Sequence, residues 1–306
     1  MKIGAWLAVM LSLAGGWTAR AGEAGKIKWP RSIEIAQGEI TEVKISGADL
    51  AAVEGRWGQE KIYFAAQGSG LFSALLGADV EAKPALSKLA LKVVRHSGQE
   101  LQSELPVKVK AKSFRTESFN VPRSFDQMTP ETLQEISRER EAFKRAFAAP
   151  IAERLWEPPF IRPVPHDVSP GSFGARRVIN GAARAPHSGT DLAAPAGVEV
   201  AASNHGRVVL AGNFFFAGGS VVLDHGGGLF TMYFHLSEFR VDEGVLVKKG
   251  DIIGLSGATG RVTGAHLHWG ARLANARVEP FELIHKTGGA DSRAGGAPPA
   301  DKKREQ

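Results

Sequence analysis

Short runs of alternating apolar and polar residues fill the chain between residue 22 and about residue 115. In each run an apolar side chain occupies every second position, which is the period of a strand with one buried face. Turn residues, mostly glycine, separate the runs. The runs that predict strands are residues 32–35, 42–45, 61–64, 88–94 and 107–110. We therefore expect a small N-terminal all-β domain over residues 22–115, built as a sandwich or a barrel.

A helical pattern follows, over about residues 130–149. Thr129 offers a capping hydroxyl, Pro130 suits the first helical turn, and Glu131 complements the positive end of the helix dipole. Apolar residues then recur at near-helical spacing, and Pro150 ends the pattern. These apolar residues are Leu133, Ile136, Phe143 and Phe147. The pattern predicts a linker over residues 116–159 that contains one amphipathic helix.

Glycine-separated strands return between residues 160 and 285. The predicted strands are residues 198–200, 206–210, 220–223, 230–234, 245–247, 251–255 and 267–271. Strands this closely spaced along the chain favour a second, antiparallel sheet domain over residues 160–285. Residues 286–306 show no apolar periodicity, which predicts a disordered tail.

The first 21 residues form a segment of their own. Lys2 supplies a positive start, residues 5–13 an apolar stretch, and Ala19-Arg20-Ala21 a small-x-small cleavage site. The apolar stretch is shorter than the roughly 20 residues that a membrane-spanning helix needs. No later segment resembles a transmembrane helix. These features predict a signal peptide over residues 1–21 and an exported protein, either periplasmic or secreted.

The composition limits which metal ligands and which binding partners are expected. The 306 residues include no cysteine, so any metal must be held by histidines and carboxylates. The formal net charge of +6 suits an anionic partner. Because the chain carries an export signal and no basic–aromatic run, an anionic polymer outside the cytoplasm is favoured over nucleic acid. We expect neither nucleic-acid binding nor an integral membrane segment after signal cleavage.

Two stretches contain candidate metal ligands. His187 and Asp191 are four residues apart, but Gly189 between them favours a turn that enters a strand, where both side chains can converge. His266 and His268 alternate, so on a strand they share one face. One of these two histidines would complete a set of two histidines and one carboxylate, which zinc accepts while keeping a position for water. The spacing alone does not say which of the two binds the metal.

A further histidine, His235, lies in the stretch Tyr233-Phe234-His235-Leu236. Together with the histidine that the metal does not take, it provides groups for acid–base chemistry. One can take the proton of the metal-bound water, and the other can stabilise an oxyanion or pass a proton to a leaving amine.

These three stretches, in this order, resemble the zinc peptidoglycan endopeptidases of the lysostaphin type. Residues 189–197, 223–229 and 257–264 agree with that pattern as well, and the resemblance covers about residues 173–281. It implies a β-rich groove fold with one zinc ion per chain. It implies His187, Asp191 and His268 as the metal ligands, and His235 and His266 as the catalytic histidines. The implied activity is hydrolysis of peptide bonds, in cross-links or stem peptides, of cell-wall peptidoglycan.

The chain departs from the family pattern at a few positions. Ala265 stands where the family often has proline, and Trp269 where it often has phenylalanine. The tyrosine that some family members contribute upstream of the first ligand cannot be placed, because Asn180 and Gly181 occupy that region.

Two other functions are compatible with parts of the sequence. One is a non-catalytic peptidoglycan-binding module or an activator of a cell-wall amidase, which the complete ligand set disfavours. Another is a lipoyl-like or biotinyl-like carrier, which the turn pattern of residues 247–254 suggests but which leaves the histidines unexplained. The sequence gives neither the bond that is cut nor the oligomeric state, and it does not show whether the N-terminal domain covers the site.

Overall fold

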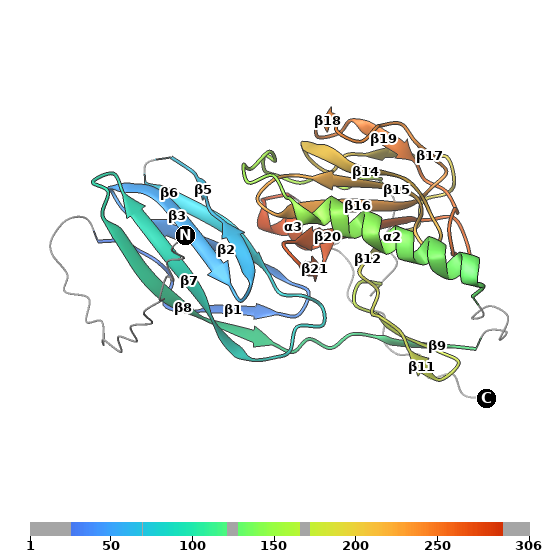
Figure 1. Cartoon of the computed structure of the whole chain (residues 1–306), viewed down its shortest axis with the longest axis horizontal. Helices are drawn as coiled ribbons and strands as arrows, with labels where there is room; N and C mark the ends of the chain where they lie inside the picture. The colour runs from blue at the N-terminus through green and yellow to red at the C-terminus, as the bar shows by residue number, and fades with distance from the viewer. Residues whose placement is uncertain (1–25, 69, 121–127, 166–171, 290–306) are drawn as a thin grey trace, which may run out of the picture.

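The computed structural model describes residues 26–68, 70–120, 128–165 and 172–289. Two β bodies lie side by side, and a long helix runs across the second body (Figure 1). The predicted fold class is confirmed: a small N-terminal β domain, a helical connector and a C-terminal domain built on an antiparallel sheet. The predicted signal peptide and nearly all of the predicted tail lie outside the described residues. No helix in the described ranges is long and apolar enough to span a membrane.

The N-terminal domain is a sandwich of two sheets around one core. Its five-stranded sheet has the order β1 (Ile33–Ala36), β8 (Glu100–Lys110), β7 (Leu86–Arg95), β3 (Leu50–Trp57) and β4 (Glu60–Tyr63). Its three-stranded sheet has the order β2 (Ile40–Ser46), β6 (Leu71–Gly77) and β5 (Ala65–Ala66). The pairing is antiparallel except between β1 and β8, which run parallel. Apolar side chains from both sheets meet in a single buried cluster, as alternating strands require.

The C-terminal domain is built on a seven-stranded sheet. Its order is β12 (Gly189–Leu192), β20 (Leu267–Leu273), β16 (Leu229–Leu236), β15 (Gly218–Asp224), β14 (Gly206–Phe214) and β18 (Leu246–Val247), and β21 (Ala276–Val278) pairs with β20. A smaller sheet contains β13 (Glu199–Ala201), β19 (Ile252–Leu255) and β17 (Glu238–Phe239). The main core joins these strands to the short helix α3 (Pro280–Lys286), with Tyr233, Trp269 and Phe281 among its largest side chains.

Two elements of the connector, a strand and a helix, pack against the rest of the protein. Strand β9 (Thr116–Phe119) pairs in parallel with β10 (Arg176–Ile179), which pairs with β11 (Ala182–Ala183). The Arg177 guanidinium lies 3.9 Å from the Glu117 carboxylate across this ribbon. Helix α2 spans Pro130–Ala148, and the Thr129 hydroxyl caps it by accepting the Thr132 N–H at 3.2 Å. Helix α2 covers one face of the seven-stranded sheet, where its phenylalanines pack on Phe214, Phe230 and Phe234 (Figure 1).

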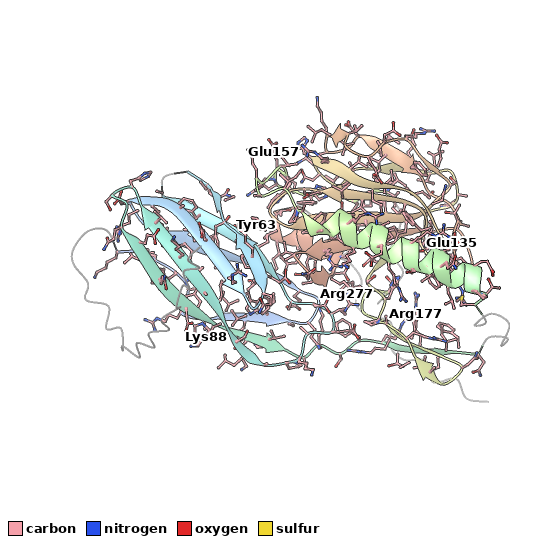
Figure 2. The ribbon with its side chains drawn as sticks, viewed as in Figure 1. Tyr63, Lys88, Glu135, Glu157, Arg177 and Arg277 are labelled. Atoms are coloured by element: carbon pink, nitrogen blue, oxygen red, sulfur yellow. The ribbon has the colours of Figure 1, made fainter. Side chains whose placement is uncertain are left out.

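The two domains are joined by polar and apolar contacts. The Arg277 guanidinium donates two hydrogen bonds to the Asp79 carboxylate, at 2.9 and 2.7 Å, and lies between the domains (Figure 2). The Glu279 N–H donates to the Gly38 carbonyl at 2.8 Å. Ile40 of the N-terminal domain is buried within the core of the C-terminal domain. The interface is therefore continuous with that core.

Candidate metal centre

Three side chains far apart in the sequence meet at the edge of the large sheet. His187 precedes β12, Asp191 lies in β12, and His268 lies opposite Asp191 in the register of β12 and β20. The His187 Nε2 atom lies 2.9 Å from His268 Nδ1 and 3.2 Å from Asp191 Oδ1, and the last two atoms are 3.1 Å apart. Each of the three residues offers one ligand atom to a common point.

This donor set fits a zinc ion. A tetrahedral zinc with ligand distances near 2.0–2.1 Å places its ligand atoms about 3.3 Å apart, close to the spacing observed here. Both histidines are buried, and Asp191 is half-buried. Two imidazole nitrogens and a carboxylate oxygen this close together suit a small cation, which would offset the repulsion among their lone pairs. The set also leaves a fourth tetrahedral position for water or substrate.

Ser172 holds two of these ligands in place. Its carbonyl accepts a hydrogen bond from His187 Nδ1 at 2.7 Å, which leaves His187 Nε2 unprotonated and able to bind a metal. Its hydroxyl oxygen accepts the Asp191 N–H at 3.1 Å. The His187 backbone is fixed as well, because its N–H donates to the Ala175 carbonyl at 3.0 Å. The segment of residues 172–175, which precedes β10, therefore sets both the tautomer and the position of the first ligand.

Glycine at position 189 makes the close approach of β12 and β20 possible. A Cβ atom at this position would lie 2.5 Å from His268 Nε2 and 2.7 Å from the Trp269 carbonyl oxygen. Neither distance is compatible with a side chain. The sequence predicted a turn at this glycine, but Gly189 begins strand β12 and its role is to provide space for the third ligand.

The electrostatics of the ligand set favour the forms that bind a metal. Burial alone would raise the pKa of Asp191, but its close contacts with the His187 and His268 rings outweigh burial and hold this pKa far below its usual value. Burial lowers the pKa of His268 to about 4, although the adjacent Asp191 opposes this shift. At neutral pH the site therefore contains an ionised carboxylate and a neutral His268 imidazole.

His235 lies beside the ligand set in an unusual backbone conformation. Its φ angle is +65°, in the left-handed region that residues other than glycine rarely adopt. The Ala217 carbonyl accepts its N–H at 2.8 Å, and the Thr259 carbonyl accepts its Nδ1–H at 3.0 Å. The neutral ring therefore keeps Nε2 unprotonated. Burial, reinforced by the nearby His268 and His266 rings, lowers the pKa of His235 to about 4.

His266 completes the cluster. It lies just before β20 and forms an isolated bridge with Gly257, so it is not part of the regular strand that His268 occupies. Its ring centroid is 4.8 Å from that of His235, and its Nε2 is 3.7 Å from Asp191 Oδ1. Its Nδ1 lies 2.9 Å from the Gly264 carbonyl. His266 thus faces the ligand set from the His235 side while His268 lies within it.

The structure brings together all five residues singled out in the sequence, and it adds others. Ser172 and Thr259 contact the imidazole rings of His187 and His235 through backbone carbonyls, so these two contacts carry no signal in the residue type. Neither tyrosine of the chain lies at the site: Tyr63 is in β4, and the Tyr233 hydroxyl accepts the Ser203 N–H in the core. The transition-state donor that could not be placed in the sequence is thus not supplied by either tyrosine.

A buried group of two histidines and one aspartate, with two more histidines beside it, has the composition of a hydrolytic metal centre. The comparisons with known proteins agree. Residues 185–280 match the family model described as Peptidase family M23. The chain also superimposes on a crystal structure assigned to peptidase M23 from Pseudomonas aeruginosa, with a TM-score of 0.63 and 28% identity, over 82% of this chain and 95% of that chain.

Two curated relatives each match about a third of the chain. Peptidoglycan DD-endopeptidase ShyA of Vibrio cholerae is 52% identical over 85 residues, which cover 28% of this chain and 20% of ShyA. DD-carboxypeptidase/endopeptidase Mpg of Neisseria meningitidis is 44% identical over 101 residues, which cover 33% of this chain and 23% of Mpg. The chain therefore matches about a fifth to a quarter of the length of each relative. Residues 185–280 form a peptidase family M23 domain of the lysostaphin type.

Proposed function

We propose that this protein is an exported zinc metalloendopeptidase that hydrolyses peptide bonds in cell-wall peptidoglycan. The observation that carries the proposal is the convergence of His187, Asp191 and His268 on one point, with His235 and His266 on one side of it. The names of the curated relatives support peptidoglycan as the substrate and a location outside the cytoplasm.

In this proposal His187 Nε2, Asp191 Oδ1 and His268 Nδ1 would hold one zinc ion. When bound, the ion would supply a Lewis acid for the scissile carbonyl and would lower the pKa of a water molecule toward about 7. Ser172 fixes the His187 tautomer, so that the ligand nitrogen needs no rearrangement before it binds. The ionised Asp191 adds the negative charge that favours a divalent cation at this site.

The remaining two histidines carry the proton chemistry. His235 donates its Nδ1–H to Thr259, so its Nε2 can accept the proton of the attacking water. The ring centroid of His266 lies 4.8 Å from that of His235, and its Nε2 lies near Asp191, so His266 faces the same region. We assign these two residues to proton transfer from the water, to stabilisation of the oxyanion and to protonation of the leaving amine.

Cleavage of a defined substrate tests the proposal. Purified full-length protein is incubated with isolated sacculi and with defined cross-linked muropeptides, and the released fragments are identified by mass spectrometry. The DD-endopeptidase names of the relatives make the peptide cross-link the bond to examine first. We expect cleavage that a zinc chelator abolishes and added zinc restores.

The same experiment separates the enzyme from the alternative, a non-catalytic binding module or amidase activator. Protein that contains one zinc ion per chain and binds sacculi, yet releases no fragment, would contradict the endopeptidase and favour the alternative. The complete set of metal-binding side chains argues for the enzyme.

A further inference from the structure

A carboxylate on helix α2 contacts the turn between β14 and β15. Glu139 Oε2 accepts a hydrogen bond from the Phe216 N–H at 3.2 Å. Burial raises the pKa of Glu139, and the amides of Phe216, Phe215 and Ala217 oppose that shift by donating toward the carboxylate. The Glu139 side chain thus accepts a hydrogen bond from the turn, in a region where the backbone amides favour an anionic oxygen.

The same turn holds His235 in place. The Ala217 carbonyl accepts the His235 N–H, and the Thr259 hydroxyl oxygen accepts the Gly219 N–H at 2.9 Å, directly after the turn. Thr259 also accepts from the His235 ring through its carbonyl. A residue with a φ of +65° keeps that conformation only where its surroundings fix it from several sides. The turn at residues 215–217 is one of those sides.

Helix α2 supports the metal ligands through a second contact. The Phe143 ring packs edge-on against Phe234, with centroids 5.5 Å apart. The Phe234 ring in turn stacks on His268, with centroids 5.4 Å apart and planes within 3° of parallel. Helix α2 therefore contacts the turn that holds His235 and the Phe234 ring that stacks on His268. It lies across that face of the sheet (Figure 1).

We propose that α2 belongs to the scaffold of the catalytic site and that Glu139 is a positioning residue for His235, acting through the turn at residues 215–217. This inference rests on the proposed function, because it concerns the geometry of the histidine assigned to proton transfer. The alternative role for helix α2 is to obstruct the path of the substrate to the site. The two roles predict opposite changes in rate when the contact is lost.

The test compares three substitutions in the full-length protein. Glu139→Ala removes the acceptor, Glu139→Gln keeps an acceptor oxygen without the charge, and Glu135→Ala is the matched control on the same helix. Glu135 is exposed and lies one helical turn earlier, near the N-terminal end of α2 (Figure 2). Zinc content, kcat and KM on a defined muropeptide are measured for each variant. The NMR signals of the Phe216 amide and the His235 ring are followed in parallel.

We expect Glu139→Ala to lower kcat by about tenfold to a hundredfold, the range found for groups that orient an active-site residue, with KM and zinc content nearly unchanged. Glu139→Gln should retain most of the activity, and the His235 signals should shift in the alanine variant only. Three outcomes would each overturn the inference. They are an equal kcat in Glu139→Ala and Glu135→Ala, an equal loss of kcat in the two Glu139 variants, and a kcat of Glu139→Ala above that of wild type.

The NMR signals separate this inference from the proposed function. If the wild-type protein fails to cleave any muropeptide, the endopeptidase is wrong. A shift of the His235 ring signals in Glu139→Ala alone would still establish the positioning contact, whereas unchanged signals would refute it.

Discussion

His187 Nε2 and His268 Nδ1 lie 2.9 Å apart, although 81 residues separate them in the chain. Each of these nitrogens is also within hydrogen-bonding distance of Asp191 Oδ1. In a site without a cation, at most one ring proton can occupy the space between them. We therefore expect the arrangement to bind a small divalent ion, and the consequences for metal content and stability can be measured.

The first prediction concerns metal binding. Wild-type protein should bind one zinc ion, and zinc should raise its melting temperature, since a ligand held only by the native state adds about 4 kcal/mol at a thousand times its dissociation constant. Asp191→Ala and His187→Ala should lose both the ion and the thermal shift. Metal analysis and thermal unfolding with and without zinc check this. Stoichiometric zinc in Asp191→Ala would contradict the ligand assignment.

The second prediction separates the catalytic histidines from the ligands. His266→Ala should keep stoichiometric zinc, because the three ligand atoms remain, but should lose about a hundredfold or more in turnover. Zinc analysis and muropeptide cleavage are measured on the same preparation. Turnover close to that of wild type would remove His266 from the mechanism, and loss of zinc would make it a ligand.

The third prediction tests the space that Gly189 provides. Gly189→Ala places a Cβ atom 2.5 Å from His268 Nε2, so β12 and β20 must separate. We expect weaker zinc binding and a loss of about 1–3 kcal/mol in the free energy of unfolding, the usual cost of overpacking. Gly264→Ala is the control, since a Cβ there meets no atom within 4 Å. Isothermal titration with zinc and denaturant unfolding compare the two variants, and equal behaviour would contradict the prediction.

The fourth prediction concerns pH and the buried His225. Its Nδ1 donates to the His205 carbonyl at 2.7 Å, its Nε2 lies 2.7 Å from the Thr231 hydroxyl, and burial lowers its pKa to about 4. The native state thus keeps His225 neutral, whereas the unfolded chain binds its proton near pH 6.5. Stability should fall as the pH drops from about 6.5 to 4, by up to about 1.4 kcal/mol per pH unit for this one group.

His235 and His268 have pKa values lowered in the same direction, so the substitution His225→Gln isolates the contribution of His225. Denaturant unfolding of zinc-free protein at several pH values should give a shallower slope for His225→Gln than for wild type. Identical slopes would show that His225 is not a buried neutral group.

The fifth prediction tests the junction between the domains. Asp79→Ala leaves the Arg277 guanidinium without its bidentate acceptor, and we expect a loss of about 1.5–3 kcal/mol in the free energy of unfolding. Glu104→Ala is the control, because its ion pair with Lys88 is exposed and should contribute less than about 1 kcal/mol. Denaturant unfolding measures both variants. An equal loss in the two would show that the junction contributes no more than a surface pair.

Most of the fold could be predicted where one face of a strand is buried. Strand β8 alternates along its second half, and its period of two is visible in the sequence. Strands β3 and β6 were not predicted. In β6 nearly every side chain is buried, because the strand lies between the N-terminal core and the second domain, so alternation disappears. In β3 alanine, glutamate and glycine weaken the strand propensity, and pairing with β7 and β4 compensates.

The site could be predicted as far as it depends on residue type. Histidines and an aspartate in an ordered pattern identify metal-binding chemistry, and the structure brings those residues together. The division of roles between His266 and His268 could not be derived from spacing, because it depends on a bridge that takes His266 out of the strand. Ser172 and Glu139 could not be assigned to the site from the sequence for a related reason. Ser172 contacts the His187 ring through its backbone carbonyl, and Glu139 accepts a hydrogen bond from the backbone amide of Phe216, which is distant in sequence.

The hydrogen bonds from Arg277 to Asp79 and the insertion of Ile40 into the second core define how the two domains pack against each other. The pairing of β9 with β10 adds a second contact between strands on either side of helix α2. Under the proposed function, the fixed position of the sandwich beside the sheet would restrict the directions from which a cross-linked polymer can approach the metal ligands.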